Sequence, residues 1–257
     1  MTSTSKGNFV WYEHLTRDPE QALAFYAEVA GWKSQPFGND GYVMLVGSQG
    51  PLGGVMKLPD DAAKMGAPPH WMGDVQVDDV DATVARVAEL GGTIYHPATD
   101  IPTVGRFAVI ADPQGAVIAV FTPGGPMEQH DSGQEGEFCW NELMTRDPAA
   151  AFGFYADVFG WKAHDAMDMG PMGTYQIFGA GDRALGGMMA IPPGAPFPPM
   201  WVYYMSTGDL EAAIERSKRN GATLMNGPMD VPGGRIAQLT DPQGAMYALH
   251  QVAKPAS

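Results

Sequence analysis

The chain carries a long internal repeat, and this repeat constrains its fold more than any other feature. Residues 138–162 repeat residues 9–33 with 15 of the 25 positions identical. Later motifs recur in the same order, once in each half: Gly53-Gly54 and Gly186-Gly187, Trp71 and Trp201, Arg106 and Arg235, and the Asp-Pro-Gln-Gly-Ala segments that begin at Asp112 and Asp241. Self-similarity of this length indicates a tandem duplication, so we expect two copies of one domain.

Each half divides again into two similar parts. Residues 9–16 alternate in character, which is typical of a strand. Asp18 and Pro19 then predict a helix start, and Gly31 predicts its end, because glycine readily adopts the left-handed conformation found there. The same order of strand and helix signals recurs from Trp71, Phe138 and Trp201. We therefore predict four βαβββ modules, at about residues 9–58, 71–122, 138–191 and 201–252.

These modules predict an α+β fold made of two tandem domains. A single βαβββ unit exposes one apolar sheet face, so two modules should pair into a curved eight-stranded mixed sheet with helices outside. The concave face inside is the natural ligand site. We place the first domain at residues 1–123 and the second at 138–257. The Gly-, Pro- and acid-rich segment 124–137 is the expected linker.

The charge and composition exclude several classes of partner. A net charge of −14 disfavours nucleic acid and anionic membrane surfaces. The lone Cys139 allows neither an intrachain disulfide nor a cysteine-based zinc site. No run approaches the roughly 18 apolar residues of a membrane span, and the first residues contain no secretory apolar core. We expect a cytoplasmic monomer or homodimer.

The repeated segments carry a family resemblance. Asp18 to Trp32 and Asp147 to Trp161 share a pattern of strand, Asp-Pro, helix, Phe-Tyr and Gly-Trp, and each half ends in an Asp-Pro-Gln-Gly turn. This pattern resembles the vicinal oxygen chelate superfamily, which includes glyoxalases, bleomycin-resistance proteins and extradiol dioxygenases. It covers about residues 9–123 and 138–252, and two-domain glyoxalase-like proteins of actinobacteria are the nearer match. The resemblance implies the fold above and a divalent metal held by His and Glu.

At the metal-ligand positions, however, this chain departs from the superfamily. The positions carried over hold Trp11 and Trp140 in the first strands, Ala119 and Ala248 in the last strands, residues near Met72 and Val202 at the module openings, and Met56 or Lys57 and Met189 or Ala190 at the fourth position. None of these is a good ligand for a hard metal. We therefore expect no metal or other cofactor at the usual site, while a divalent metal elsewhere stays possible but disfavoured.

Polar side chains occur two residues farther along these strands, which keeps the same strand face. They are Glu13 and Asp74 in the first half, Glu142, Tyr204 and His250 in the second, with Phe121 at the position that matches His250. We predict that Glu142, Tyr204 and His250 converge as a catalytic group, acting as general acid and base or as part of a weak metal site. The alternative is that the glutamates are structural and that His250 is an ordinary packed histidine.

The expected ligand contacts come from aromatic residues and from two arginines. Trp11 and Trp140, with several of the 17 methionines, would wall an apolar cavity that suits a flat or hydrophobic molecule. Equally, they could simply be core. Arg106 and Arg235 could clamp a ligand carboxylate or phosphate, or could form salt bridges, with Glu13 or Glu142 as the expected partners.

Three functions remain open on the sequence alone. The first is a glyoxalase- or bleomycin-resistance-like protein that binds a small apolar or aromatic molecule in the concave cavity without the usual metal. The alternative is a lyase, isomerase or dioxygenase-type enzyme with a displaced site at Glu142 and His250. The third is a duplicated fold that serves only as a partner interface.

Overall fold

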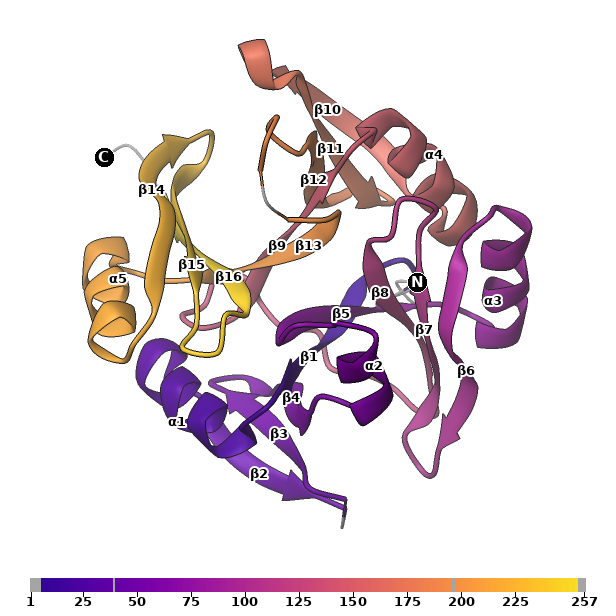
Figure 1. The fold of residues 1–257 in the computed structure, drawn as a ribbon, viewed down its shortest axis with the longest axis horizontal. Helices are drawn as coiled ribbons and strands as arrows, with labels where there is room; N and C mark the ends of the chain where they lie inside the picture. Colours follow the sequence, from indigo (N-terminus) through magenta and orange to yellow (C-terminus); the bar gives the residue numbers. More distant parts are fainter. Residues whose placement is uncertain (1–5, 39, 196, 254–257) are drawn as a thin grey trace. The chain divides into compact units, whose positions relative to one another are not determined.

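The computed structural model describes residues 6–38, 40–195 and 197–253, which form four βαβββ modules (Figure 1). The first module contains β1 (Phe9–Thr16), α1 (Pro19–Ala30), β2 (Lys33–Phe37), β3 (Tyr42–Gly47) and β4 (Gly50–Lys57), and the second contains β5 (His70–Gln76), α3 (Val80–Glu89), β6 (Thr93–Ile101), β7 (Gly105–Ala111) and β8 (Val117–Pro123). The third contains β9 (Phe138–Thr145), α4 (Pro148–Phe159), β10 (Lys162–Asp168), β11 (Thr174–Ala180) and β12 (Arg183–Ala190), and the fourth contains β13 (Met200–Ser206), α5 (Leu210–Arg219), β14 (Thr223–Val231), β15 (Gly234–Thr240) and β16 (Met246–Val252). A short helix α2 (Asp60–Lys64) and a single 3-10 turn, η1 (Gly170–Met172), lie outside this pattern.

The strands form two eight-stranded mixed sheets. One has the order β2-β3-β4-β1-β5-β8-β7-β6, and the other repeats it as β10-β11-β12-β9-β13-β16-β15-β14. Within each module the first and last strands are parallel, as in the pairs β1 with β4 and β13 with β16, and the remaining pairs are antiparallel. The predicted fold class, an α+β arrangement of paired βαβββ modules, is therefore confirmed.

The chain also forms two compact units, and each unit takes strands from both halves of the sequence. The first unit consists mainly of residues 72–129 and 140–201. The second consists mainly of residues 11–71 and the segment from residue 202 onward, together with His130–Cys139. The domain boundaries expected from the sequence stay a prediction.

The helix starts and stops follow from the residues at the helix ends. The Asp18 carboxylate accepts a hydrogen bond from the backbone N–H of Gln21, Pro19 occupies the first turn of α1, and Gly31 ends the helix with a φ of 72°. The third module uses the same devices, with Asp147 as the N-terminal cap of α4 and Gly160 at a φ of 74°. These local predictions are confirmed.

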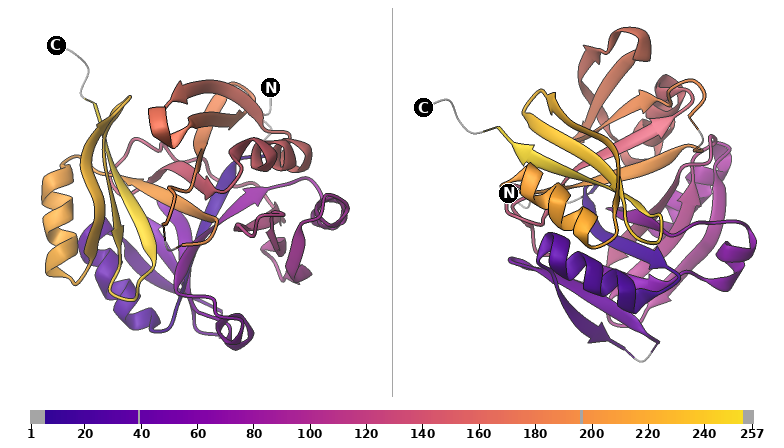
Figure 2. Two further views of the ribbon diagram at one scale, coloured as in Figure 1. Left: turned by 45° about the horizontal axis from the view of Figure 1, so that its top comes forward. Right: turned by 60° about the vertical axis from the view of Figure 1, so that its left-hand side comes forward.

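Aromatic side chains fill the core of the second unit. Helix α1 lies beside α5, as Figure 2 shows, and buries Phe25 and Tyr26 toward the strands. Tyr26 meets the rings of Trp32 and Trp71 at centroid distances of 5.6 and 5.1 Å. No helix in the described part of the chain is both long and apolar enough to cross a membrane.

Candidate ligand site

A chain of three polar side chains lies on one face of the first module. Trp11 Nε1 donates a hydrogen bond to Tyr42 Oη at 2.8 Å, and Tyr42 Oη donates to Glu13 Oε1 at 2.7 Å. Trp11 and Glu13 project to the same side of β1, because they are two residues apart, and Tyr42 reaches them from β3. We call this arrangement the Trp–Tyr–Glu relay.

The third module contains a second copy of the Trp–Tyr–Glu relay. Trp140 Nε1 donates to Tyr175 Oη at 2.7 Å, and Tyr175 Oη donates to Glu142 Oε2 at 3.1 Å. Glu142 is 6% exposed and Tyr175 is 8% exposed, so both polar groups of this copy are buried. Burying them without partners would cost free energy, and the relay supplies those partners.

The Gly-Gly pairs that the sequence repeats explain how the tyrosines fit. A Cβ atom at Gly54 would overlap the hydroxyl and ring of Tyr42, and one at Gly187 would overlap the ring of Tyr175. The preceding glycine, Gly53, faces the backbone carbonyl of Tyr12 across the parallel pair of β1 and β4, where a Cβ atom has no room either. The first glycine of each pair therefore lets two parallel strands approach closely, and the second makes room for the tyrosine of the relay.

The relay lies on the strand face that α1 does not cover. On β1, Tyr12 and His14 are buried, and the His14 ring meets Tyr26 of α1 at 5.2 Å, so these residues mark the helix side. Glu13 points to the opposite side, beside its register partner Gly54 and, one strand farther, Met44. The positions nearest to Glu13 on the two neighbouring strands, Gly54 and Met44, are therefore uncharged and apolar.

Burial changes the acid–base behaviour of the relay. Desolvation raises the pKa of Glu13 to about 7, although the hydrogen bond from Tyr42 and the nearby Trp11 indole act in the opposite direction. Burial also raises the pKa of Tyr175 well above its usual value of 10, and the neighbouring Glu142 carboxylate adds to the rise. Glu13 can therefore exchange a proton near neutral pH, while Tyr175 stays a hydroxyl.

The remaining predicted site residues have separate partners. Tyr204 Oη accepts a hydrogen bond from Gln238 at 2.8 Å, and His250 Nδ1 lies 3.6 Å from the Cys139 thiol. Burial lowers the pKa of His250 and raises that of Cys139 to about 11, so the thiol stays protonated. Asp74 is buried, at 7% exposure. The predicted convergence of Glu142, Tyr204 and His250 joins residues of both units and stays a prediction.

Phe121 and His250 occupy matching places, as the repeat implies. Phe121 is buried at 6% exposure, and its ring lies where a Cβ atom on Gly105 would point. Gly234 leaves the same space for the imidazole of His250. Each glycine therefore makes room for one of the two rings.

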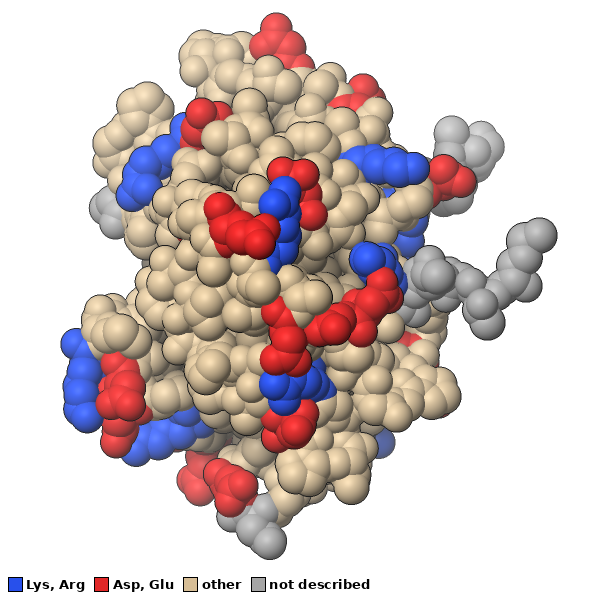
Figure 3. Space-filling model, turned by 90° about the vertical axis from the view of Figure 1, so that its right-hand side faces the viewer, with Lys and Arg blue, Asp and Glu red and all other residues tan. Residues whose placement is uncertain are grey.

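The two arginines are engaged in surface ion pairs. Arg106 Nε donates to Asp81 at 2.8 Å and Arg106 Nη1 to Asp100 at 2.8 Å. Arg235 pairs in the same way with Glu211 and, at 3.3 Å, with Asp230. The expectation that Glu13 or Glu142 would be the partner was wrong, because acidic residues on the preceding helix and the adjacent strand pair with the arginines instead. Figure 3 shows one face of the molecule, on which the lysine and arginine side chains of the described residues lie beside acidic ones and form no positive patch.

The donor set does not fit the metal that the superfamily resemblance implies. Trp11 and Trp140 use their only polar side-chain atoms as hydrogen-bond donors to tyrosines. Ala119 and Ala248 have no side-chain atom that could bind a metal. Among residues 6–38, 40–195 and 197–253, no three His, Cys, Asp or Glu side chains are grouped so that they could hold a metal ion. A zinc-like ion needs about three or four such ligands.

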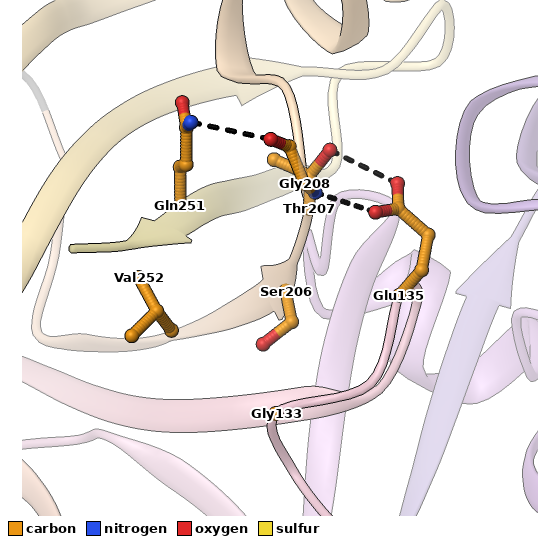
Figure 4. A pocket seen from close by; sticks show the side chains of 7 residues that line it. All are labelled: Gly133, Glu135, Ser206, Thr207, Gly208, Gln251 and Val252. Atoms are coloured by element: carbon orange, nitrogen blue, oxygen red, sulfur yellow. Dashed lines mark hydrogen bonds between the residues drawn. The ribbon is translucent and has the colours of Figure 1, made fainter. Parts of the chain in front are cut away.

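A small pocket lies elsewhere in the second unit. It has a volume of about 340 Å³ and is lined by Gly133, Glu135, Ser206, Thr207, Gly208, Gln251 and Val252 (Figure 4). The Glu135 carboxylate accepts hydrogen bonds from the Gly208 N–H and the Thr207 hydroxyl, and Gln251 donates to the Gly208 carbonyl at 3.2 Å. These contacts attach the segment that precedes β9 to the start of α5, which is a structural role.

The sequence reasoning missed Tyr42 and Tyr175, although a signal was present. Each tyrosine stands 11 residues before the Gly-Gly pair of its own half. Such a repeated spacing could have indicated that tyrosine and glycine meet across two neighbouring strands.

Comparisons with known proteins agree with this architecture. Residues 11–121 match the model of the glyoxalase-like domain, and residues 139–249 match that of the glyoxalase/bleomycin resistance protein/dioxygenase superfamily. The protein named "Putative glyoxylase CFP32" from Mycobacterium bovis is 34% identical over 96% of this chain and 94% of its own length. The anthracycline biosynthesis protein DauV from Streptomyces sp. strain C5 is 28% identical over 97% and 94%.

Solved structures share the fold at low sequence identity. The Mn(II)-bound glyoxalase from Novosphingobium aromaticivorans has a TM-score of 0.63 at 16% identity, covering 96% of this chain and 82% of its own. Homoprotocatechuate 2,3-dioxygenase from Arthrobacter globiformis has a TM-score of 0.68 at 14% identity, covering 96% and 80%. With a full-length relative above 30% identity, the conclusion is direct: the chain belongs to the glyoxalase/bleomycin resistance protein/dioxygenase superfamily, with two glyoxalase domains.

Proposed function

We propose that this protein binds a small apolar or aromatic molecule against the Trp–Tyr–Glu faces of its sheets, without the metal that the superfamily commonly uses. The observation that carries the proposal is the pair of relays. In each copy a tryptophan stands at a position of a metal ligand, and its indole N–H is committed to a tyrosine. The indole ring then offers an apolar surface rather than a ligand for an ion.

The side chains around each relay support an apolar ligand. In the first module Met44 and Met56 share the face of Glu13, and in the third module Met144 and Met189 are register partners on the face of Glu142. Methionine adapts its shape to irregular apolar molecules, and burying apolar ligand surface contributes roughly 25 cal/mol per Å².

The relatives are consistent with this ligand class. DauV and DnrV are named for the biosynthesis of anthracyclines, which are flat aromatic compounds, and each is 28% identical to this chain. The mycobacterial CFP32 proteins are named as glyoxylases and are 34% identical. The two names point to different chemistry, and the apolar relay faces favour the aromatic ligand.

An enzyme is the second candidate, and the raised pKa of Glu13 favours it. A carboxyl group that titrates near pH 7 is suited to general acid–base catalysis of an isomerase or lyase type. The displaced site at Glu142 and His250 remains part of this candidate. Turnover that Glu13→Gln abolishes while aromatic binding persists would establish it.

Binding of naphthalene tests the main proposal. The protein is titrated with naphthalene by equilibrium dialysis, and Trp11→Ala and Trp140→Ala are compared with Met65→Ala, which alters an exposed residue. Each tryptophan variant should lose affinity at one site, roughly tenfold, because the ring supplies a large part of the contact. Equal binding by all four proteins would exclude the relay faces as the ligand site.

A further inference from the structure

One oxygen atom of Glu13 has no hydrogen-bond partner inside the relay. Oε1 accepts the Tyr42 hydrogen bond, whereas Oε2 is buried and has no hydrogen-bond partner among the residues that the structure describes. Leaving a buried acceptor unsatisfied costs about 1–3 kcal/mol, and native proteins contain few such atoms. An oxygen atom without a hydrogen-bond partner is suited to bind a polar group of a ligand.

The rest of the relay holds this oxygen in place. Trp11 donates its only N–H to Tyr42, and Tyr42 donates its hydroxyl hydrogen to Glu13, so neither donor is free for a ligand. Because Gly54 gives the Tyr42 ring its space, the carboxyl group is oriented before any ligand binds. A preorganised group loses little conformational entropy on binding.

The surroundings of Glu13 define the charge of a suitable ligand. Its register partners across the sheet are Gly54, Met44 and Gln35, and none of them carries a charge. An anionic ligand would therefore meet a carboxyl group with no cation from these positions to offset it. A hydroxyl group can donate to the ionised carboxylate, and a carbonyl group can accept from the protonated acid.

We propose that Glu13 Oε2 is the polar anchor of the ligand site in the first half, and that the ligand is an uncharged aromatic molecule bearing a hydroxyl or carbonyl group. This inference rests on the proposed function and names the chemical class of the ligand. Trp11 and Tyr42 are positioning residues for the carboxyl group.

Three matched probes test the proposal: naphthalene, 2-naphthol and 2-naphthoate. Dissociation constants are measured by equilibrium dialysis at pH 7 in a Trp140→Ala background, which weakens the second-half site. The parent protein should bind 2-naphthol about tenfold more tightly than naphthalene, which corresponds to one hydrogen bond to a carboxyl group, and should not prefer 2-naphthoate.

Replacing the carboxyl group should remove this preference. In Glu13→Leu the ratio of the 2-naphthol and naphthalene affinities should fall to about one, as expected for the loss of that hydrogen bond, while naphthalene itself still binds. Glu28→Leu, which alters an exposed residue of α1, is the control and should keep the tenfold preference. If Glu13→Leu does not fold, Glu13→Met takes its place, because its unbranched apolar side chain has a similar length and offers the naphthol hydroxyl no strong hydrogen-bonding atom.

The outcomes separate the two proposals. If naphthalene and 2-naphthol both bind with a ratio that Glu13 variants leave unchanged, the anchor is wrong and the apolar site stands. Tighter binding of 2-naphthoate than of 2-naphthol also overturns the anchor. If no probe binds the parent protein, the proposed function itself fails.

Discussion

His14 Nε2 lies 3.0 Å from Asp241 Oδ2, with both side chains buried in the core of the second unit. Asp241 Oδ2 also accepts from Tyr26, and Oδ1 accepts the backbone N–H groups of Gln243 and Ala245. The matching Asp112 in the first unit binds Tyr155 and its own loop, and Leu143 replaces the histidine. The duplicated chain therefore contains one core carboxylate with an imidazole partner and one without.

This difference predicts unequal effects of the same substitution. In both variants the tyrosine hydroxyl, Tyr26 or Tyr155, can turn to accept from the new amide nitrogen. Only Asp241→Asn also places that nitrogen against the buried ring nitrogen of His14. Burial raises the pKa of Asp112, which means that its site favours a neutral side chain, and asparagine is neutral. Asp241→Asn should lower the free energy of unfolding by about 1.5–3 kcal/mol more than Asp112→Asn. Urea unfolding of both variants checks this, and equal losses would contradict it.

The glycine that makes room for Tyr42 predicts a coupled pair of substitutions. Gly54→Ala should destabilise the protein by roughly 1–3 kcal/mol, because the new methyl group overlaps the tyrosine ring. The loss should shrink in a Tyr42→Leu background, which a double-mutant cycle measures. Gly153→Ala on the exposed side of α4 is the control, with nothing near its Cβ position, and should be neutral or stabilising by about 0.5–1 kcal/mol. Additive effects at Gly54 and Tyr42 would speak against the steric explanation.

The raised pKa of Glu13 predicts a pH-dependent stability. The folded-state pKa is raised from 4.5 to about 7, so folding favours the protonated form of Glu13. The stability that this protonated carboxyl group contributes is fully present below pH 4.5 and is lost as the pH rises through 7. Glu13→Gln lacks this loss. Relative to the wild type, the variant should therefore gain about 3 kcal/mol between pH 4.5 and pH 8, as an order of magnitude.

Unfolding curves at several pH values measure the difference directly. Glu28→Gln, at an exposed position of α1, should follow the wild type at every pH. A Glu13→Gln variant that tracks the wild type from pH 4.5 to 8 would show that Glu13 titrates as an ordinary carboxyl group.

The arginine ion pairs predict small effects. The Arg106 side chain is 33% exposed and its partner Asp81 is 63% exposed, so the pair is screened by solvent. Arg106→Ala and Arg235→Ala should each lower the free energy of unfolding by at most about 1 kcal/mol and leave the affinity for 2-naphthol unchanged. A tenfold loss of affinity in either variant would place that arginine in the ligand site.

The repeat and the alternation of strands made much of the fold predictable. Four modules, the caps at Asp18 and Gly31, and the shared face of Trp11 and Glu13 all follow from local patterns. Strand β2, Lys33–Phe37, gives no local strand signal of its own, since it is exposed throughout and contains Pro36. Exposed strands lack the hydrophobic alternation that identifies strands elsewhere.

The relay partners and the core pairs depend on contacts that the sequence does not encode locally. Tyr42 reaches Glu13 across 29 positions, and His14 reaches Asp241 across 227. A repeat shows that modules are alike but not which modules pack together. The arginines, expected to meet Glu13 or Glu142, pair instead with acids of their own module, such as Asp81 and Asp100 for Arg106.

The central claim, aromatic binding without a metal, is tested most directly by one calorimetric titration. Naphthalene is titrated into protein treated with EDTA, and then into the same protein with one equivalent of Mn²⁺ per domain. The account predicts the same dissociation constant in both cases, with a negative heat-capacity change from apolar burial. Binding that is absent after EDTA treatment and restored by Mn²⁺ would contradict it.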